Sequence, residues 1–247
     1  FRSGIKVSQR ALATMKRISM ELGGKSPFII LPGADYEKAV RMCFNSLLLN
    51  SGQTCTALSR LIIPKEAKAE IEQIILKVLP EYTVGDPTLE TTKVGAVASK
   101  EQWNIVDSYI AKGIEEGATV LAGGRPEPPE KGYFINPTVF TDVTNDMTIA
   151  QEEIFGPVLC VLTYEGVDQA LAIANDTKYG LNGAVWGPDK EEATKVAEGI
   201  LSGNIYVNGS PRDVTAPFGG FKDSGLGREG GKDGMLEFTE PQAIFNA

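Results

Sequence analysis

Apolar residues along this chain alternate between short continuous runs and stripes at helical spacing. The run over residues 28–31 is typical of a strand buried on both faces of a sheet. Asp35, a residue favoured at helix N-caps, then precedes a stretch in which apolar side chains recur every three or four positions. These side chains are Val40, Cys43, Phe44, Leu47 and Leu48. The pattern predicts a core-facing helix, with Cys43 buried inside it.

The same alternation continues along the chain. Further strands are predicted over residues 58–63, 118–122, 158–164, 184–186 and 205–207. Further helices are predicted over residues 67–78, 168–175 and 190–200, and another is predicted to begin after Ser99 as its N-cap. Strands that alternate with helices indicate an α/β fold, with a largely parallel sheet flanked by helices. Cys160 falls within a predicted strand and is expected in the core.

The two ends of the chain differ from this pattern. Leu12, Met15 and Ile18 predict a helix over residues 8–20, stopped by Gly23 and Gly24. Near the other end, residues 216–229 are glycine-rich and irregular, and residues 235–245 are interpreted as an extended segment. Such a segment is either a strand of its own domain or an edge strand that pairs with another subunit.

Composition narrows the class of protein. With 24 basic and 32 acidic residues, the net charge of −8 does not favour nucleic acid or an anionic membrane as a partner. No apolar run approaches the roughly 20 residues that span a bilayer. The three cysteines cannot all pair within one chain, which indicates a reducing compartment, and we expect a cytoplasmic protein. The chain has no histidine, which excludes a histidine-based triad and histidine-ligated zinc, and no metal site is expected.

Cys55 is the candidate nucleophile. It follows an amphipathic helix, and its small or polar neighbours in the stretch 50–56 favour an accessible sulfur with backbone N–H groups nearby. The alternative is a small apolar residue of the core, as most free cysteines are. Glu21 is expected at a helix end, and by itself it is more typical of a solvated carboxylate. Phe155 by itself is more typical of a core aromatic.

Four motifs together resemble the aldehyde dehydrogenase superfamily. They are MELGGKSP at 20–27, GQTC at 52–55, QEEIFGPV at 151–158 and PFGGFKDSGLGRE at 217–229. They occur in the family order over nearly the whole chain, and the spacing from Glu21 to Cys55 is also that of the family. The chain resembles the C-terminal, catalytic half of such an enzyme.

The resemblance implies a role for each matching residue. Cys55 would add to an aldehyde, hydride would pass to NAD or NADP, and Glu21 would activate the water that hydrolyses the resulting thioester. The Cys55 backbone N–H would be one donor to the developing oxyanion. Glu153 would hold the ribose on the nicotinamide side, Phe155 would pack beside the nicotinamide, and Leu22 and Gly23 would line the same cofactor site. Gly219, Gly220 and Gly225 are expected to shape the backbone.

The resemblance also implies a division of the chain. Residues 1–23 would be a remnant of the NAD(P)-binding domain, 24–224 the catalytic domain, and 225–247 a C-terminal segment that forms an inter-subunit strand in a homodimer or homotetramer. The family's cofactor-specifying residues and a second oxyanion donor, an asparagine, have no counterpart in this chain. Residues 1–8 carry serines where the family has a glycine pair near the pyrophosphate.

Two other functions remain open at this stage. The chain is either an aldehyde dehydrogenase catalytic half or a catalytically silent domain that acts through assembly. A CoA-acylating relative is a third alternative, against which Glu21 weighs because that reaction needs no water-activating carboxylate.

Overall fold

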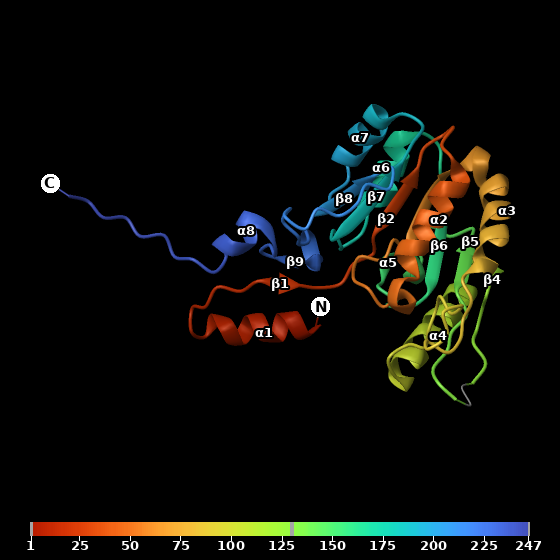
Figure 1. The fold of residues 1–247 in the computed structure, drawn as a ribbon, viewed down its shortest axis with the longest axis horizontal. Helices are drawn as coiled ribbons and strands as arrows, with labels where there is room; N and C mark the ends of the chain where they lie inside the picture. The colour runs from red at the N-terminus through yellow and green to blue at the C-terminus, as the bar shows by residue number, and fades with distance from the viewer. Residues whose placement is uncertain (1, 129–130, 247) are drawn as a thin grey trace.

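A seven-stranded sheet forms the centre of the computed structural model, which describes residues 2–128 and 131–246 (Figure 1). The strand order is β4-β5-β6-β3-β2-β7-β8, and every neighbouring pair is parallel except β4 with β5. The strands are β2 Pro27–Ile30, β3 Arg60–Pro64, β4 Thr119–Ala122, β5 Thr138–Thr141, β6 Val158–Tyr164, β7 Asn182–Trp186 and β8 Asn204–Val207. The predicted α/β fold with a largely parallel sheet is confirmed.

Helices cover both faces of this sheet and bury a separate apolar cluster on each. On one face lie α2 (Tyr36–Leu47) and α3 (Lys68–Val78). The other face carries α4 (Lys100–Glu115), α5 (Thr148–Gln151), α6 (Val167–Asn175) and α7 (Lys190–Glu198). Four short 3-10 helices complete these layers: η1 Leu49–Gly52, η2 Lys65–Ala67, η3 Leu79–Glu81 and η4 Lys222–Ser224.

Local signals predicted these layers well. The carboxylate of Asp35 accepts the Lys38 N–H, and the hydroxyl of Ser99 accepts the Gln102 N–H, so both predicted N-caps are confirmed. Cys43 and Cys160 are fully buried, one in each apolar cluster. In the part of the chain that the structure covers, the helices are too short or too polar to cross a membrane.

The two ends of the chain meet in a small ribbon beside the central sheet (Figure 1). Strand β1 (Met20–Glu21) pairs antiparallel with β9 (Gly225–Leu226), which places Glu21 opposite Gly225. Helices α1 (Arg2–Leu12) and α8 (Gly231–Leu236) flank the ribbon. Arg17 and Glu240 form an ion pair across the same two segments. The predicted domain boundaries at 23/24 and 224/225 therefore divide segments that contact each other, and the boundaries stay predictions.

The helix predicted over residues 8–20 is wrong in position. Helix α1 ends at Leu12, and Met15 takes a left-handed conformation with φ 53°. The Lys16 N–H bonds the Ala11 carbonyl and the Met15 N–H bonds the Leu12 carbonyl, which is the Schellman pattern of a helix end. Glycine normally marks this motif in a sequence, whereas here a methionine occupies the left-handed position. Met15 is 89% exposed, so it belongs to no core-facing stripe.

The extended segment predicted over residues 235–245 is wrong at its start, because Met235 and Leu236 belong to α8. After α8, the described residues up to 246 form no strand, and the segment runs away from the body of the molecule (Figure 1). A strand paired within the same domain is therefore not seen among the described residues. The inter-subunit strand stays a prediction.

The loops that carry the predicted site residues lead into the amino ends of parallel strands. Gly23 precedes β2, Cys55 precedes β3, and Glu153 and Phe155 precede β6. Because these three strands are neighbours, with β3 between β2 and β6, their preceding loops meet at one edge of the sheet. The fold thus gathers residues that are far apart in the sequence.

Candidate active site

The Cys55 loop has an unusual backbone that its own polar side chains hold in place. Asn50, Ser51 and Gly52 all have positive φ angles, 51°, 59° and 79°. The Asn50 amide donates to the Gln53 carbonyl, and the Gln53 amide donates back to the Asn50 carbonyl. Two left-handed non-glycine residues in succession are costly, so these side-chain hydrogen bonds help to stabilise the turn.

Gly52 is required at its position for two reasons. Its φ of 79° lies in the left-handed region, and a Cβ atom there would lie 2.2 Å from the carbonyl carbon of Gly156. The Cys55 loop therefore packs directly, backbone to backbone, against the turn that contains Phe155. The Gln53 side chain also accepts the Ala98 N–H, which ties the loop to the segment before α4.

A cleft of about 470 Å³ brings the predicted site residues together. Its lining residues are Glu21, Leu22, Gly23, Cys55, Glu153, Phe155, Phe218 and Glu229. All six residues proposed from the motifs lie there, contributed by the ribbon and by three separate loops. Their shared position agrees with a common site, while their individual roles stay predictions.

Glu21 lies on β1 and not at a helix end, which corrects the sequence interpretation. Both of its carboxylate oxygens are shielded from solvent, and neither has a hydrogen-bond partner among the residues described. Burial first, and then the Glu229 carboxylate, raise the pKa of Glu21 to about 7 against the opposing effect of Arg228. A carboxyl group in this state exchanges a proton near neutral pH, as a general base requires.

Glu153 is held by the backbone around Gly23. The Gly24 N–H donates to Glu153 Oε1 at 3.0 Å, and a Cβ at Gly23 would lie 2.1 Å from Oε2. Burial raises the pKa of Glu153, while the Gly24 N–H and the Lys25 ammonium counteract that rise. The absence of a side chain at Gly23 thus leaves the space that the carboxylate occupies.

The Cys55 thiol is half-buried at the same cleft. Burial raises its pKa, and the carboxylates of Glu153 and Glu21 add to the rise. The backbone N–H groups of Cys55 and Thr56 act in the opposite direction, because they hydrogen-bond the sulfur and favour the thiolate. The cleft therefore places one thiol between carboxylates that disfavour its ionisation and N–H groups that favour it.

Phe218 and Glu229 are lining residues that the sequence interpretation missed, although both lie in the quoted motif at 217–229. They form an isolated antiparallel bridge with each other. The Arg212 guanidinium lies over the Phe218 ring, 4.6 Å from its centroid. The sequence carried a signal for the segment but not for the direction of these side chains.

The glycines of this last motif shape the backbone, as expected. Gly219 and Gly225 have φ angles of 156° and 146°, and a Cβ at Gly225 would lie 1.9 Å from the Met20 carbonyl oxygen. A Cβ at Gly220 would lie 2.4 Å from the Ser224 side chain. Gly225 therefore permits the close approach of β9 to β1, and through it the placement of Glu21.

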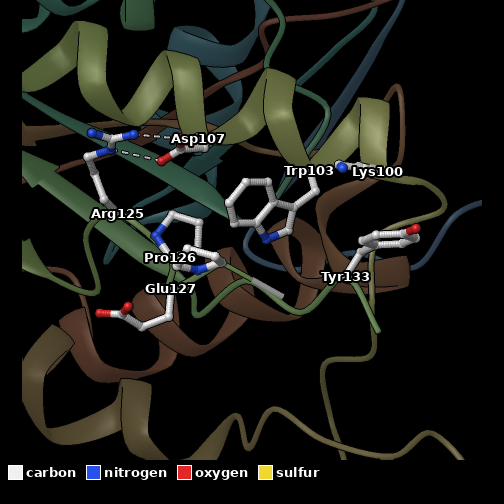
Figure 2. A pocket seen from close by; sticks show the side chains of 8 residues that line it. Lys100, Trp103, Asp107, Arg125, Pro126, Glu127 and Tyr133 are labelled. Atoms are coloured by element: carbon white, nitrogen blue, oxygen red, sulfur yellow. Dashed lines mark hydrogen bonds and ion pairs between the residues drawn. The ribbon is translucent and has the colours of Figure 1, made fainter. Parts of the chain in front are cut away.

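A larger cavity, about 710 Å³, opens elsewhere on the molecule, between α4 and the segment around Arg125 (Figure 2). Arg125 donates two hydrogen bonds to Asp107 there, and the Trp103 indole N–H donates one to the Phe134 carbonyl. None of the predicted site residues lines it. Its size alone does not make it the candidate active site, because no cysteine is among the described residues that line it and two of its charged groups, Arg125 and Asp107, form an ion pair with each other.

The fold and the cleft together define an α/β protein in which a candidate cysteine nucleophile shares a cleft with a glutamate whose pKa is raised. The chain belongs to the aldehyde dehydrogenase family, whose family model matches residues 2–244. It is 48% identical to a Staphylococcus saprophyticus protein assigned to the aldehyde dehydrogenases, over 98% of this chain and 51% of that protein. The chain spans about half the length of the curated relatives it matches.

Solved structures give the same result. The chain superposes on a variant of aldehyde dehydrogenase C from Pseudomonas syringae, complexed with NAD⁺ and octanal, with a TM-score of 0.96 and 44% identity. That match covers 98% of this chain and 50% of the other. An aldehyde dehydrogenase from Mycobacterium tuberculosis complexed with NAD⁺ gives a TM-score of 0.93 at 43% identity, over 97% of this chain and 50% of the other.

Proposed function

We propose that the protein containing this chain oxidises an aldehyde to a carboxylic acid, with NAD as hydride acceptor. The observation that carries the proposal is the single cleft shared by Cys55, Glu21 and Glu153. We propose NAD and not NADP as the acceptor because the similar enzymes from Pseudomonas syringae and Mycobacterium tuberculosis are described in complex with NAD⁺.

The cleft residues suit the nicotinamide end of such a cofactor. Glu153 presents a carboxylate whose Oε1 is anchored by the Gly24 N–H, and a carboxylate of this kind accepts hydrogen bonds from ribose hydroxyls. Phe155 has a φ angle of 55° and a partly exposed side chain, so its ring is accessible and could pack against a flat ligand such as nicotinamide. Leu22 and Gly23 would form the adjoining wall. When bound, the cofactor would supply a hydride acceptor.

The residues of this chain would carry the remaining chemistry. The Cys55 thiol gives up its proton to solvent, its sulfur forms a bond to the aldehyde carbon as the carbonyl double bond opens, and the Cys55 N–H donates to the oxygen that becomes negatively charged. Loss of a hydride from that carbon to the acceptor that the cofactor would supply leaves a thioester on the sulfur. Glu21 takes a proton from a water molecule, whose oxygen bonds the thioester carbon. The carbon–sulfur bond then breaks, which releases the acid, and the proton held by Glu21 passes to the sulfur and restores the thiol.

Two substitutions test this function in the full-length protein. Cys55→Ala is expected to abolish aldehyde-dependent NADH formation, because the acyl group has no acceptor. Glu21→Gln is expected to retain a first burst of NADH and then stall, with an acyl adduct on Cys55 visible by mass spectrometry. Full steady-state activity in Cys55→Ala would refute the proposal, and an acyl-CoA product formed only when CoA is added would favour the CoA-acylating alternative.

A second proposal concerns assembly. Large apolar side chains at the two chain ends are exposed, among them Met235, Phe238, Ile244 and Phe245, the last at 93%. Because large apolar side chains that are exposed together in one segment mark interaction surfaces, we propose that the C-terminal segment pairs with a second copy in a homodimer or homotetramer. Light scattering on the full-length protein with Phe238, Ile244 and Phe245 replaced by serine would then report a smaller mass. An unchanged mass would refute this assembly.

A further inference from the structure

Two asparagines link the central sheet to two of the segments that line the cleft. Asn182 begins β7 and Asn204 begins β8, and the two are register partners in adjacent parallel strands. The Asn182 amide donates to the Thr56 carbonyl at 2.8 Å, and the Asn204 amide donates to the Pro217 carbonyl at 3.2 Å. Thr56 directly follows Cys55, and Pro217 directly precedes Phe218.

In both asparagines the side-chain NH₂ group makes a hydrogen bond, whereas the side-chain oxygen makes none with the described residues. A peptide carbonyl can only accept, so each amide must turn its NH₂ group toward the cleft segment. Both Oδ1 atoms are shielded from solvent without a partner in the described parts of the chain. A buried amide with an unused oxygen carries a cost, and its remaining NH₂ bond must account for its presence.

The hydrogen bond from Asn182 holds the turn that directly follows Cys55. Asn182 binds the carbonyl of the Thr56–Ala57 peptide, whose N–H bonds the Thr54 carbonyl. The preceding Cys55–Thr56 peptide carries the Thr56 N–H that favours the thiolate, and a Cβ at Gly24 would lie 2.5 Å from its carbonyl oxygen. Loss of the Asn182 bond would therefore loosen Thr56, the residue that joins these two peptides.

We propose that Asn182 and Asn204 are positioning residues with separate effects: Asn182 fixes the turn that places the Cys55 thiol and the N–H groups beside it, and Asn204 holds the segment that carries Phe218. The proposal rests on Cys55 being the reactive thiol of the proposed function. Its chemical consequence, the reactivity of that thiol, requires neither aldehyde nor cofactor and is measured independently.

Alkylation of Cys55 by iodoacetamide in the full-length protein tests the first effect. The thiolate is the form that reacts, so the rate against pH reports how well the sulfur is stabilised. Cys43 and Cys160 are fully buried, and the Cys55→Ala protein identifies any labelling elsewhere. Asn182→Ala is expected to move the alkylation profile to higher pH and to slow alkylation at pH 7 by about threefold or more.

Two matched variants separate positioning from general loosening. Asn204→Ala is expected to leave the alkylation profile in place and to raise KM for the aldehyde more than it lowers kcat. Asn175→Ala removes another amide-to-carbonyl bond, to Gly199, in a part of the fold away from the cleft, and it should leave both the profile and KM unchanged. If Asn182→Ala does not fold, Asn182→Leu removes the same NH₂ group in a side chain of similar size and adds no charge beside the thiol.

The outcomes are distinct. A folded Asn182 variant with a wild-type alkylation profile overturns the proposal, and so does an equal shift in Asn204→Ala or Asn175→Ala. A shifted profile in the Asn182 variant alone supports it. An active Cys55→Ala protein would refute the proposed function instead, and would leave the alkylation result unaffected.

Discussion

The hydrolytic step should depend on pH through Glu21. Because burial and Glu229 raise the pKa of Glu21 to about 7, the ionised fraction is about 9% at pH 6 and about 91% at pH 8. Thioester hydrolysis should therefore accelerate roughly tenfold across this range and then reach a plateau. A glutamate with an ordinary pKa would already be about 97% ionised at pH 6, and its profile would be nearly flat.

A pH-jump experiment isolates this step from the ionisation of the thiol. The acyl-enzyme is formed first in the full-length protein, then mixed into buffers from pH 5.5 to 9, and the loss of the adduct on Cys55 is followed by quenched mass spectrometry. In Glu21→Gln, only hydroxide attack remains, so the slow residual rate should rise steadily without a plateau. A flat wild-type profile, or a plateau that survives in Glu21→Gln, would refute the assignment of Glu21 as the base.

Three further predictions concern stability. Arg60 is fully buried and donates to the Lys25, Ile173 and Ala174 carbonyls and to Asn145, so Arg60→Ala should cost about 3 kcal/mol or more in urea unfolding; a loss below about 1 kcal/mol would contradict this. Gly52→Ala should cost about 2 kcal/mol or more, because it combines a left-handed φ with a Cβ 2.2 Å from Gly156, and an unchanged midpoint would show that the loop relaxes freely. Since the folded pKa of Glu21 lies above its unfolded value of 4.5, its ionisation destabilises the fold as pH rises from about 4.5 to about 7, and Glu21→Gln should raise Tm at pH 8 but not at pH 4.

The central sheet was predictable because its signals are local. Apolar runs identified the strands, and Asp35 and Ser99 identified helix starts that depend on a hydrogen bond only three residues away. The ribbon was not predictable in the same way. Its strand β1 has two residues and pairs with a segment near the other end of the chain, so no local periodicity announces it. Met15 ends α1 without the glycine that usually marks such a helix end.

The candidate site was predictable from its motifs only as a set of segments. The motif residues Cys55, Glu21 and Glu153 do share a cleft, but the burial that raises the pKa of Glu21 becomes visible only in three dimensions. Asn182 lies in none of the motifs. The positioning role proposed for it depends on one hydrogen bond to a residue 126 positions earlier, which the sequence pattern of a buried strand does not reveal.

The ribbon that carries Glu21 can form only after the end of the chain has been synthesised, because β1 pairs with β9. The Cys55 loop lies between α2 and β3, whereas the partner strand of Glu21 begins at Gly225, 170 residues after Cys55. During synthesis, the segment that pairs with β1 leaves the ribosome long after the Cys55 loop. Under the proposed function, the Cys55 loop would therefore form before the ribbon that positions Glu21, and proteolytic loss of the residues after η4 would leave a protein able to accept an acyl group and poorly able to release it.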